Sequence, residues 1–194
     1  MSTNNATTTN QQATTWEEAA ALLQAGKVGI IPTDTVYGLV GSARVPEVVE
    51  RMYTIKQRQD NKPYIVLIPS LDSLQEFGIP ATEKIRKLFV HTTESPASSI
   101  LPCPEETFTY IHRGKKSIAF RIPQHTSLQK LLQEVGPLVA PSANPHGLPI
   151  AKTIAEARNY FGDTVDFYID GSTLDTPPSR LLRLHEDGST EVLR

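Results

Sequence analysis

Two polar side chains spaced two residues apart end an apolar run in the segment Ala-Pro-Ser-Ala-Asn-Pro, residues 140–145. Alternate residues of an extended chain point the same way, so the hydroxyl of Ser142 and the carboxamide of Asn144 are expected side by side. Pro141 and Pro145 favour this geometry, because a proline fixes its own φ and restricts the residue before it. The alternative is a loop whose Ser and Asn only satisfy local backbone groups.

A second pair of chemically capable residues, Lys56 and Arg58, follows the helix-like residues 46–55. Residues two apart do not share a helix face, so both cations reach one target only if the helix has already ended. A point charge and a planar guanidinium, together with the hydroxyl and amide of Ser142 and Asn144, suit a polyphosphate or a phosphate-plus-carboxylate ligand. The alternative is that the cations only complement the C-terminal end of the helix.

Hydroxyl groups also gather in the segment Thr-Asp-Thr-Val-Tyr-Gly at residues 33–38, directly after the buried-strand pattern of residues 28–32. We expect a glycine turn at its end and a cradle of hydroxyls and backbone amides for a small polar ligand. The alternative is a strand that ends in a capped turn.

Taken together, the motifs resemble the YrdC-type threonylcarbamoyl-AMP synthases in order and spacing. Those that carry the resemblance are Pro-Thr-Asp-Thr-Val-Tyr-Gly-Leu at 32–39, Lys-x-Arg at 56–58, Ser-Ile-Ala-Phe-Arg-Ile-Pro at 117–123 and Ala-Pro-Ser-Ala-Asn-Pro-His-Gly at 140–147. The resemblance implies an α/β fold of one domain, with a twisted mixed β-sheet flanked by helices. It also implies an enzyme that makes threonylcarbamoyl-AMP and pyrophosphate from L-threonine, bicarbonate and ATP, with Mg²⁺ carried by the nucleotide. Partner proteins would then use the adenylate to modify the adenosine beside the anticodon of tRNA.

The same resemblance implies roles for single side chains. The set that resembles the family's catalytic and ATP-binding group comprises Lys56, Arg58, Ser142 and Asn144. The set expected on the threonine side comprises Thr35, Tyr37, Ala140 and Ser179. Arg194 resembles a late nucleotide-binding arginine.

The chain departs from the family pattern in two places. Family members usually carry Trp-Pro-Gly-Pro-x-Thr before the strand at Ser117, where this chain has Glu-Ser-Pro-Ala-Ser-Ser at residues 94–99. We expect Ser99 to supply the missing hydroxyl. Many long-form relatives also have a histidine where this chain has Leu67. The first departure keeps a second function open, a non-catalytic nucleotide- or RNA-binding member of the same superfamily.

Composition narrows the class of protein. A chain of 194 residues with 39% hydrophobic residues is able to bury one full core, and a single cysteine excludes a disulfide framework. No transmembrane run or secretory signal is evident, so we expect a cytoplasmic protein with no membrane partner. The formal net charge of −2 argues against bulk nucleic-acid binding, although a local basic face with Arg113, Lys115 and Lys116 suggests a weak tRNA contact. No metal site is predicted, and both a Walker loop and a dinucleotide glycine fingerprint are absent from the sequence.

The elements that must position these residues alternate along the chain. Residues 1–14 are rich in Thr, Asn and Gln and are expected to be a disordered tail before one domain at 15–194. Helices are predicted at 16–24, 46–55, 82–90, 127–135 and 153–161. Strands are predicted at 28–32, 64–68, 117–122, 138–140 and 165–169, with a C-terminal hairpin of 180–185 and 190–193.

Overall fold

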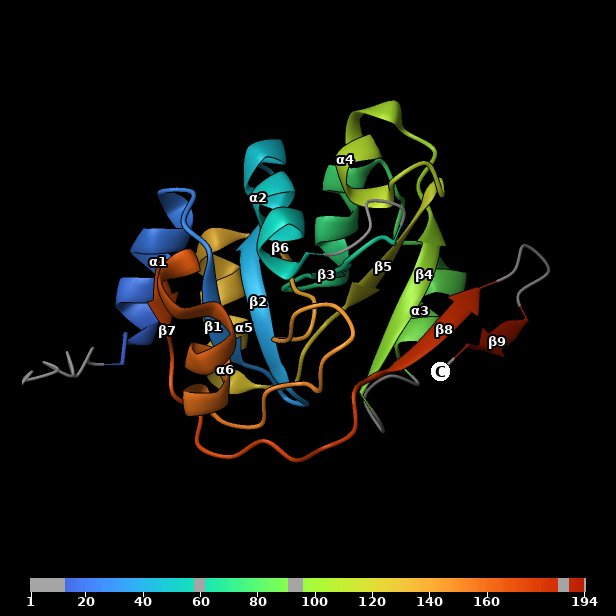
Figure 1. The fold of residues 1–194 in the computed structure, drawn as a ribbon. Coiled ribbons are helices and arrows are strands. Elements are labelled where there is room, and N and C mark those ends of the chain that lie inside the picture. Colours follow the sequence, from blue (N-terminus) through green and yellow to red (C-terminus); the bar gives the residue numbers. More distant parts are fainter. Residues whose placement is uncertain (1–12, 58–61, 91–95, 185–188, 194) are drawn as a thin grey trace, which may run out of the picture.

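A single mixed β-sheet organises the computed structural model, which describes residues 13–57, 62–90, 96–184 and 189–193. Its strands are β1 (Gly29–Pro32), β2 (Tyr37–Ser42), β3 (Ile65–Leu67), β4 (Ala97–Pro102), β5 (Ser117–Arg121), β6 (Leu138–Val139), β7 (Phe167–Tyr168), β8 (Arg180–Leu184) and β9 (Thr190–Val192). Their order in the sheet is β7-β1-β2-β6-β3-β5-β4-β8-β9 (Figure 1). Three neighbouring pairs are parallel (β1 with β7, β3 with β5, β4 with β8), and the other neighbouring pairs, including the consecutive run β1-β2-β6-β3, are antiparallel. The predicted α/β fold with a mixed sheet flanked by helices is confirmed, and β8 and β9 form the predicted hairpin.

Side-chain caps mark the start of three of the helices within the described residues. The helices are α1 (Trp16–Gln24), α2 (Pro46–Lys56), α3 (Glu83–Val90), α4 (Thr109–His112), α5 (Thr126–Val135) and α6 (Ile154–Phe161), with 3₁₀ turns η1 (Leu71–Phe77), η2 (Glu106–Phe108) and η3 (Gly162–Thr164). Thr15 caps α1 in the predicted capping box with Glu18, and Thr153 caps α6. Of the predicted tail, residues 1–12 lie outside the described residues, and Thr14 already donates its N–H to the Tyr168 carbonyl.

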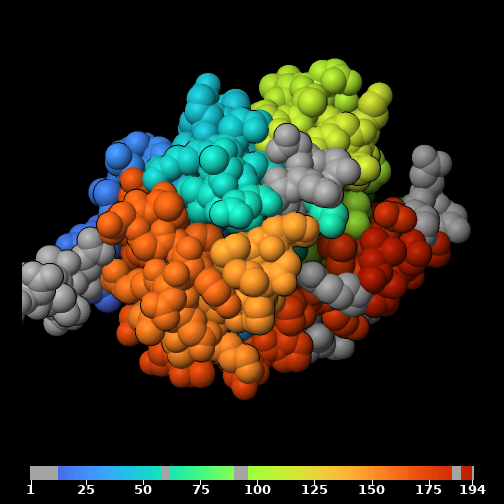
Figure 2. Space-filling view, viewed as in Figure 1, coloured from blue at the N-terminus to red at the C-terminus, as the bar shows by residue number. Residues whose placement is uncertain are grey.

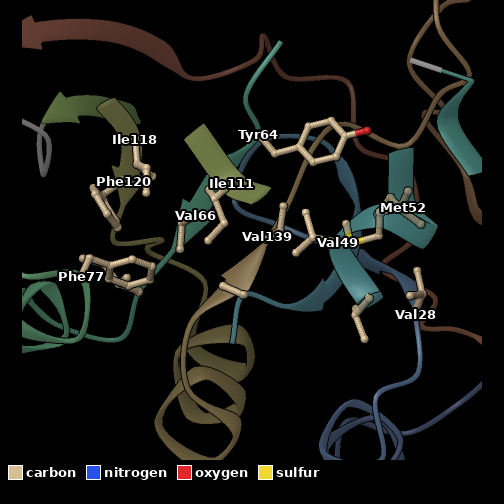
Figure 3. Packing of buried hydrophobic residues seen from close by; sticks show 14 of the residues in the cluster. Val28, Val49, Met52, Tyr64, Val66, Phe77, Ile111, Ile118, Phe120 and Val139 are labelled. Carbon is tan, nitrogen blue, oxygen red and sulfur yellow. The ribbon is translucent and has the colours of Figure 1, made fainter. Parts of the chain in front are cut away.

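Each face of the sheet carries its own hydrophobic cluster. On one face Val66, Phe120 and Val139 meet Val49 and Met52 of α2, together with residues of η1 and α4 (Figure 3). On the other face, Leu67 and Leu138 pack against α1 and α5. Alternate residues of β3 and β6 thus enter different clusters, as the two-residue period of a strand requires.

Two strands were not predicted from the sequence, β2 and β4. The expected glycine turn at Gly38 is wrong, because Gly38 lies inside β2 and pairs with Ile31 of β1. Further along β2, a Cβ on Gly41 would stand 2.6 Å from a methyl of Val48 and 2.9 Å from the Met52 sulfur. The glycines of β2 therefore mark a strand that a helix crosses at close range rather than a turn.

The fold predicts a stability change at alkaline pH through Tyr168. Its side chain is 4% exposed and donates a hydrogen bond to the Gly162 carbonyl at 2.7 Å. Burial raises the pKa of Tyr168 to about 12, while the Arg158 charge lowers this pKa and Asp163 raises it. Between pH 10 and 12 the unfolded chain therefore loses a proton that the folded chain keeps, so stability present below pH 10 is lost as pH rises.

Urea unfolding between pH 9 and 11.5 should therefore show a smaller loss of stability in Tyr168→Phe than in the wild type. The difference should approach about 2 kcal/mol, since one pKa unit corresponds to roughly 1.4 kcal/mol. Parallel pH profiles for the two proteins would contradict this assignment.

Candidate active site

A cavity of about 180 Å³ opens over β3, β5 and β8, on the sheet face that carries Leu67. Its lining includes four of the predicted threonine- or nucleotide-side residues: Thr35, Ala140, Ser142 and Ser179. It also contains Thr33 of the predicted hydroxyl cradle, together with Tyr64, Arg121 and Pro178, for which no role was predicted. Segments from five separate parts of the chain thus meet at one concave surface.

Lys56, the last residue of α2, is 2% exposed. Its Nζ donates to the carbonyl oxygens of Ser142 at 2.5 Å and Asn144 at 2.6 Å, and lies 3.3 Å from the Asn144 Oδ1. Gln57 at φ 51° ends the helix, as the Lys-x-Arg spacing requires. A buried ammonium needs hydrogen-bond acceptors, and the turn at residues 142–144 supplies them.

Ser142 and Asn144 lie side by side, as their spacing predicts. The Ser142 Oγ donates to the Asn144 Oδ1 at 2.7 Å, and the Asn144 Nδ2 donates to the Leu148 carbonyl at 2.6 Å. Backbone pairing of Ser142 with Gly38 attaches this turn to β2. In Figure 2 the light-orange segment around these residues lies against the teal end of α2, where His146 donates its N–H to the Lys56 carbonyl.

Arg121 is the main site residue that the sequence reasoning assigned no role. It ends β5, is 5% exposed, and donates to the Asp34 Oδ1 at 2.6 Å and to the Thr35 Oγ1 at 3.1 Å. Its Nε has no hydrogen-bond partner among the described residues. A buried guanidinium with spare donor capacity at a cavity wall suits a carboxylate or phosphate ligand. Its sequence signal was a charged residue inside the apolar strand 117–122.

Ser99 is directed away from the cavity, and its neighbour Ser98 lies on the cavity's side of the sheet. Ser99 pairs with Phe120 and Leu182, so its side chain lies on the face of the first hydrophobic cluster. Ser98 pairs with Leu181, which lines the cavity, and its Oγ lies 3.1 Å from the Ser179 Oγ. Successive residues of β4 point to opposite faces of the sheet, so the prediction that Ser99 supplies a hydroxyl to the site is wrong.

Tyr37 is also placed differently from the prediction, because it does not reach the cavity wall. The side chain is fully buried, and its hydroxyl accepts from the Gly171 N–H and donates to the Ser172 carbonyl, both at 2.8 Å. Burial raises the pKa of this hydroxyl, the Gly171 hydrogen bond lowers it, and the Asp170 charge raises it. The hydroxyl therefore stays protonated near neutral pH and ties β2 to the segment after β7.

Several predictions fall elsewhere. Arg58 and Arg194 lie outside the described residues, so their predicted nucleotide contacts stay predictions. The suggested basic face is smaller than expected, because the Arg113 side chain is 13% exposed, pairs with Glu50 and stacks over the Tyr53 ring.

Across residues 13–57, 62–90, 96–184 and 189–193, no three His, Cys, Asp or Glu side chains cluster in a metal-binding arrangement. No helix within those same ranges has the length and hydropathy needed to cross a membrane.

Comparison with known proteins assigns this chain to a family. The family model for Sua5, YciO and YrdC proteins, described as "Telomere recombination", matches residues 21–194. The chain belongs to the Sua5/YciO/YrdC family. A threonylcarbamoyl-AMP synthase of Idiomarina loihiensis is 33% identical over 165 residues, which are 83% of this chain and 88% of that protein. A threonylcarbamoyl-AMP synthase of Bacillus subtilis is 37% identical over 134 residues, 68% of this chain and 39% of that protein.

Solved structures in the family share the fold. Sua5 of P. abyssi complexed with L-threonine matches with a TM-score of 0.84 and 28% identity over 94% of this chain and 55% of that one. YciO of E. coli matches with a TM-score of 0.80 and 23% identity over 92% of this chain and 87% of that one. The chain therefore spans nearly all of some relatives and about half or less of Sua5 and the B. subtilis synthase.

The buried hydrogen bonds from the Lys56 ammonium to two backbone carbonyls predict that this residue stabilises the fold. Lys56→Ala would remove the donor shared by the Ser142 and Asn144 carbonyls, and should lower the free energy of unfolding by about 1–3 kcal/mol. The matched control is Lys152→Ala, an exposed lysine paired with Asp175, which should change stability by less than about 1 kcal/mol. Equal stability of the two variants by urea unfolding would refute this role.

Removing the hydroxyl group of Ser98 or of Ser99, neighbours on β4, should change the stability of the protein in opposite directions. The Ser99 Oγ is buried without a hydrogen-bond partner among the described residues, so Ser99→Ala should raise stability by up to about 1 kcal/mol. Ser98→Ala loses the contact with Ser179 and should lower stability by a similar amount. Thermal unfolding of both variants checks the assignment, which fails if Ser99→Ala is the less stable of the two.

Proposed function

We propose that this chain is a threonylcarbamoyl-AMP synthase that joins L-threonine, bicarbonate and ATP. One observation carries the proposal: the buried Arg121 guanidinium, with an Nε that has no partner among the described residues, stands in the same cavity wall as Thr35, Ser142 and Ser179. Such a cavity offers an unpaired guanidinium N–H for a carboxylate, on an arginine whose other end pairs with Asp34, beside hydroxyls for a small polar side chain. The names of the relatives support this reading and give the chemistry its substrates.

The reaction needs two bond-forming steps. The threonine nitrogen attacks bicarbonate, forming an N–C bond and releasing water to leave a carbamate. A carbamate oxygen then attacks the α-phosphorus of ATP, and the bond from that phosphorus to the bridging oxygen breaks as its electron pair leaves with pyrophosphate. Charge develops on phosphoryl oxygens, so preplaced cations and dipoles lower the barrier more than a nucleophilic side chain would. The reaction transfers a nucleotidyl group to the carbamate.

We assign the residues to two ends of the cavity. At the amino-acid end, Arg121 would bind the threonine carboxylate, while Thr35 and Ser179 would face the rest of that substrate. At the nucleotide end, the Ser142 hydroxyl and Asn144 carboxamide would contact the phosphates and the carbamoyl group. Lys56 supports this end by holding the turn from beneath and by adding positive charge close to it. Arg58 is proposed as a further phosphate contact.

We further propose that Mg²⁺ arrives with the nucleotide, because the described residues hold no ligand cluster of their own. The ion would neutralise phosphate charge. The adenylate product would pass to proteins that modify tRNA. The Ser98 hydroxyl, which contacts the Ser179 hydroxyl beside the cavity, supports an enzyme rather than a purely binding protein.

Pyrophosphate release from ATP tests the proposal directly. Release should require both threonine and bicarbonate, and Asn144→Ala should lower the rate by about a hundredfold, as expected for loss of one electrostatic contact. Asn159→Ala removes the same group from an exposed position of α6 and should keep the wild-type rate. ATP binding without threonine-dependent release would contradict the proposal and favour a binding protein.

A further inference from the structure

The connection between β7 and β8, residues 169–179, crosses most of the sheet; we call it the strap. Figure 1 shows it as the long orange-to-red segment that runs beneath the sheet to the start of β8. β7 and β8 stand first and eighth in the strand order, a separation of about 34 Å at roughly 4.8 Å per strand. Eleven residues reach at most about 40 Å when fully extended. The strap therefore crosses a wide span with few residues, and its path is set by the contacts it makes on the way.

Its first half is fixed by Tyr37. The buried hydroxyl bonds both the Gly171 N–H and the Ser172 carbonyl at 2.8 Å, and Asp170 closes a small turn by accepting from the Ser172 N–H at 2.8 Å. Close packing accompanies these bonds, because a Cβ on Gly171 would stand 2.3 Å from the Cβ of Pro32. The strap thus lies directly on the end of β1, at a distance that only glycine allows.

The second half of the strap contributes residues to the cavity wall. The Thr176 hydroxyl donates to the Thr35 carbonyl, and Pro178 and Ser179 then form part of the cavity wall. Ser179 is 4% exposed and shares its hydroxyl contact with Ser98. An outer ion pair, Lys152 with Asp175 at 2.6 Å, is largely exposed and is expected to contribute little.

We propose that Tyr37 is a positioning residue for the amino-acid end of the cavity, acting through the strap on Pro178 and Ser179. This inference rests on the proposed function and adds a determinant of threonine affinity that does not touch the substrate. Tyr37 and Thr35 come from the same short segment, so one stretch of chain both lines the cavity and sets its opposite wall.

The test compares Tyr37→Phe with two matched controls. Tyr110→Phe removes another tyrosine hydroxyl that donates to a backbone carbonyl, that of Ala43 at 2.8 Å, away from the strap. Asp175→Asn breaks the exposed outer contact of the strap itself. Titration calorimetry with L-threonine and the KM values for threonine and ATP report on the site, and hydrogen–deuterium exchange of residues 169–179 reports on the strap.

Tyr37→Phe should weaken threonine binding and raise its KM by about five- to tenfold, leave the KM for ATP within about twofold, and speed exchange in the strap. Both controls should match the wild type in threonine affinity. Gly171→Ala, which pushes the strap off Pro32, should reproduce the Tyr37→Phe effects. Wild-type threonine affinity in Tyr37→Phe would overturn the inference alone. A wild-type protein that binds no threonine would overturn the proposed function, and this inference with it.

Discussion

The structure depends on a buried positive charge that must be matched. An ammonium taken out of water costs several kcal/mol unless acceptors surround it, and Lys56 finds them in the carbonyls of Ser142 and Asn144. This requirement fixes the end of α2 against the turn after β6. The turn in turn pairs with Gly38 of β2, so one charge joins a helix, two strands and the polar pair that the sequence presents most clearly.

A second buried cation organises the other end of the cavity. Arg121 is neutralised by Asp34, which also accepts the Gln124 N–H at 3.0 Å, and it bonds Thr35. Thr35 and Tyr37 then anchor the strap that brings in Ser179. The cavity is therefore built from contacts between segments 32–37, 117–123, 140–145 and 169–179, and several of these contacts come from Asp34, Tyr37 and Lys56, which do not line it. These contacts hold the polar groups of the cavity in place, and groups fixed in advance stabilise developing charge without having to move.

The sequence predicted what local signals specify. The capping box at Thr15 and the period of α5 marked helices, and the spacing of Ser142 and Asn144 gave their shared direction. What it did not predict depends on partners far along the chain. β4 carries Ser98 and Ser99, polar residues that become buried because β5 and β8 pair on both sides, and this pairing decides which serine lies on the cavity's side of the sheet. The role of Arg121 likewise depends on Asp34, 87 residues away. The pairing of the strand before the Ser-x-Asn pair also depends on distant partners, since β6 runs antiparallel to both β2 and β3.

The most direct measurement traces the carbonyl carbon. The protein is incubated with ATP, L-threonine and ¹³C-bicarbonate, and the quenched mixture is analysed by mass spectrometry. The account predicts an adduct of threonine and AMP whose mass rises by one ¹³C relative to unlabelled bicarbonate, with the label lost when threonine is omitted. An adenylate without label, or ATP bound and never converted, would contradict it.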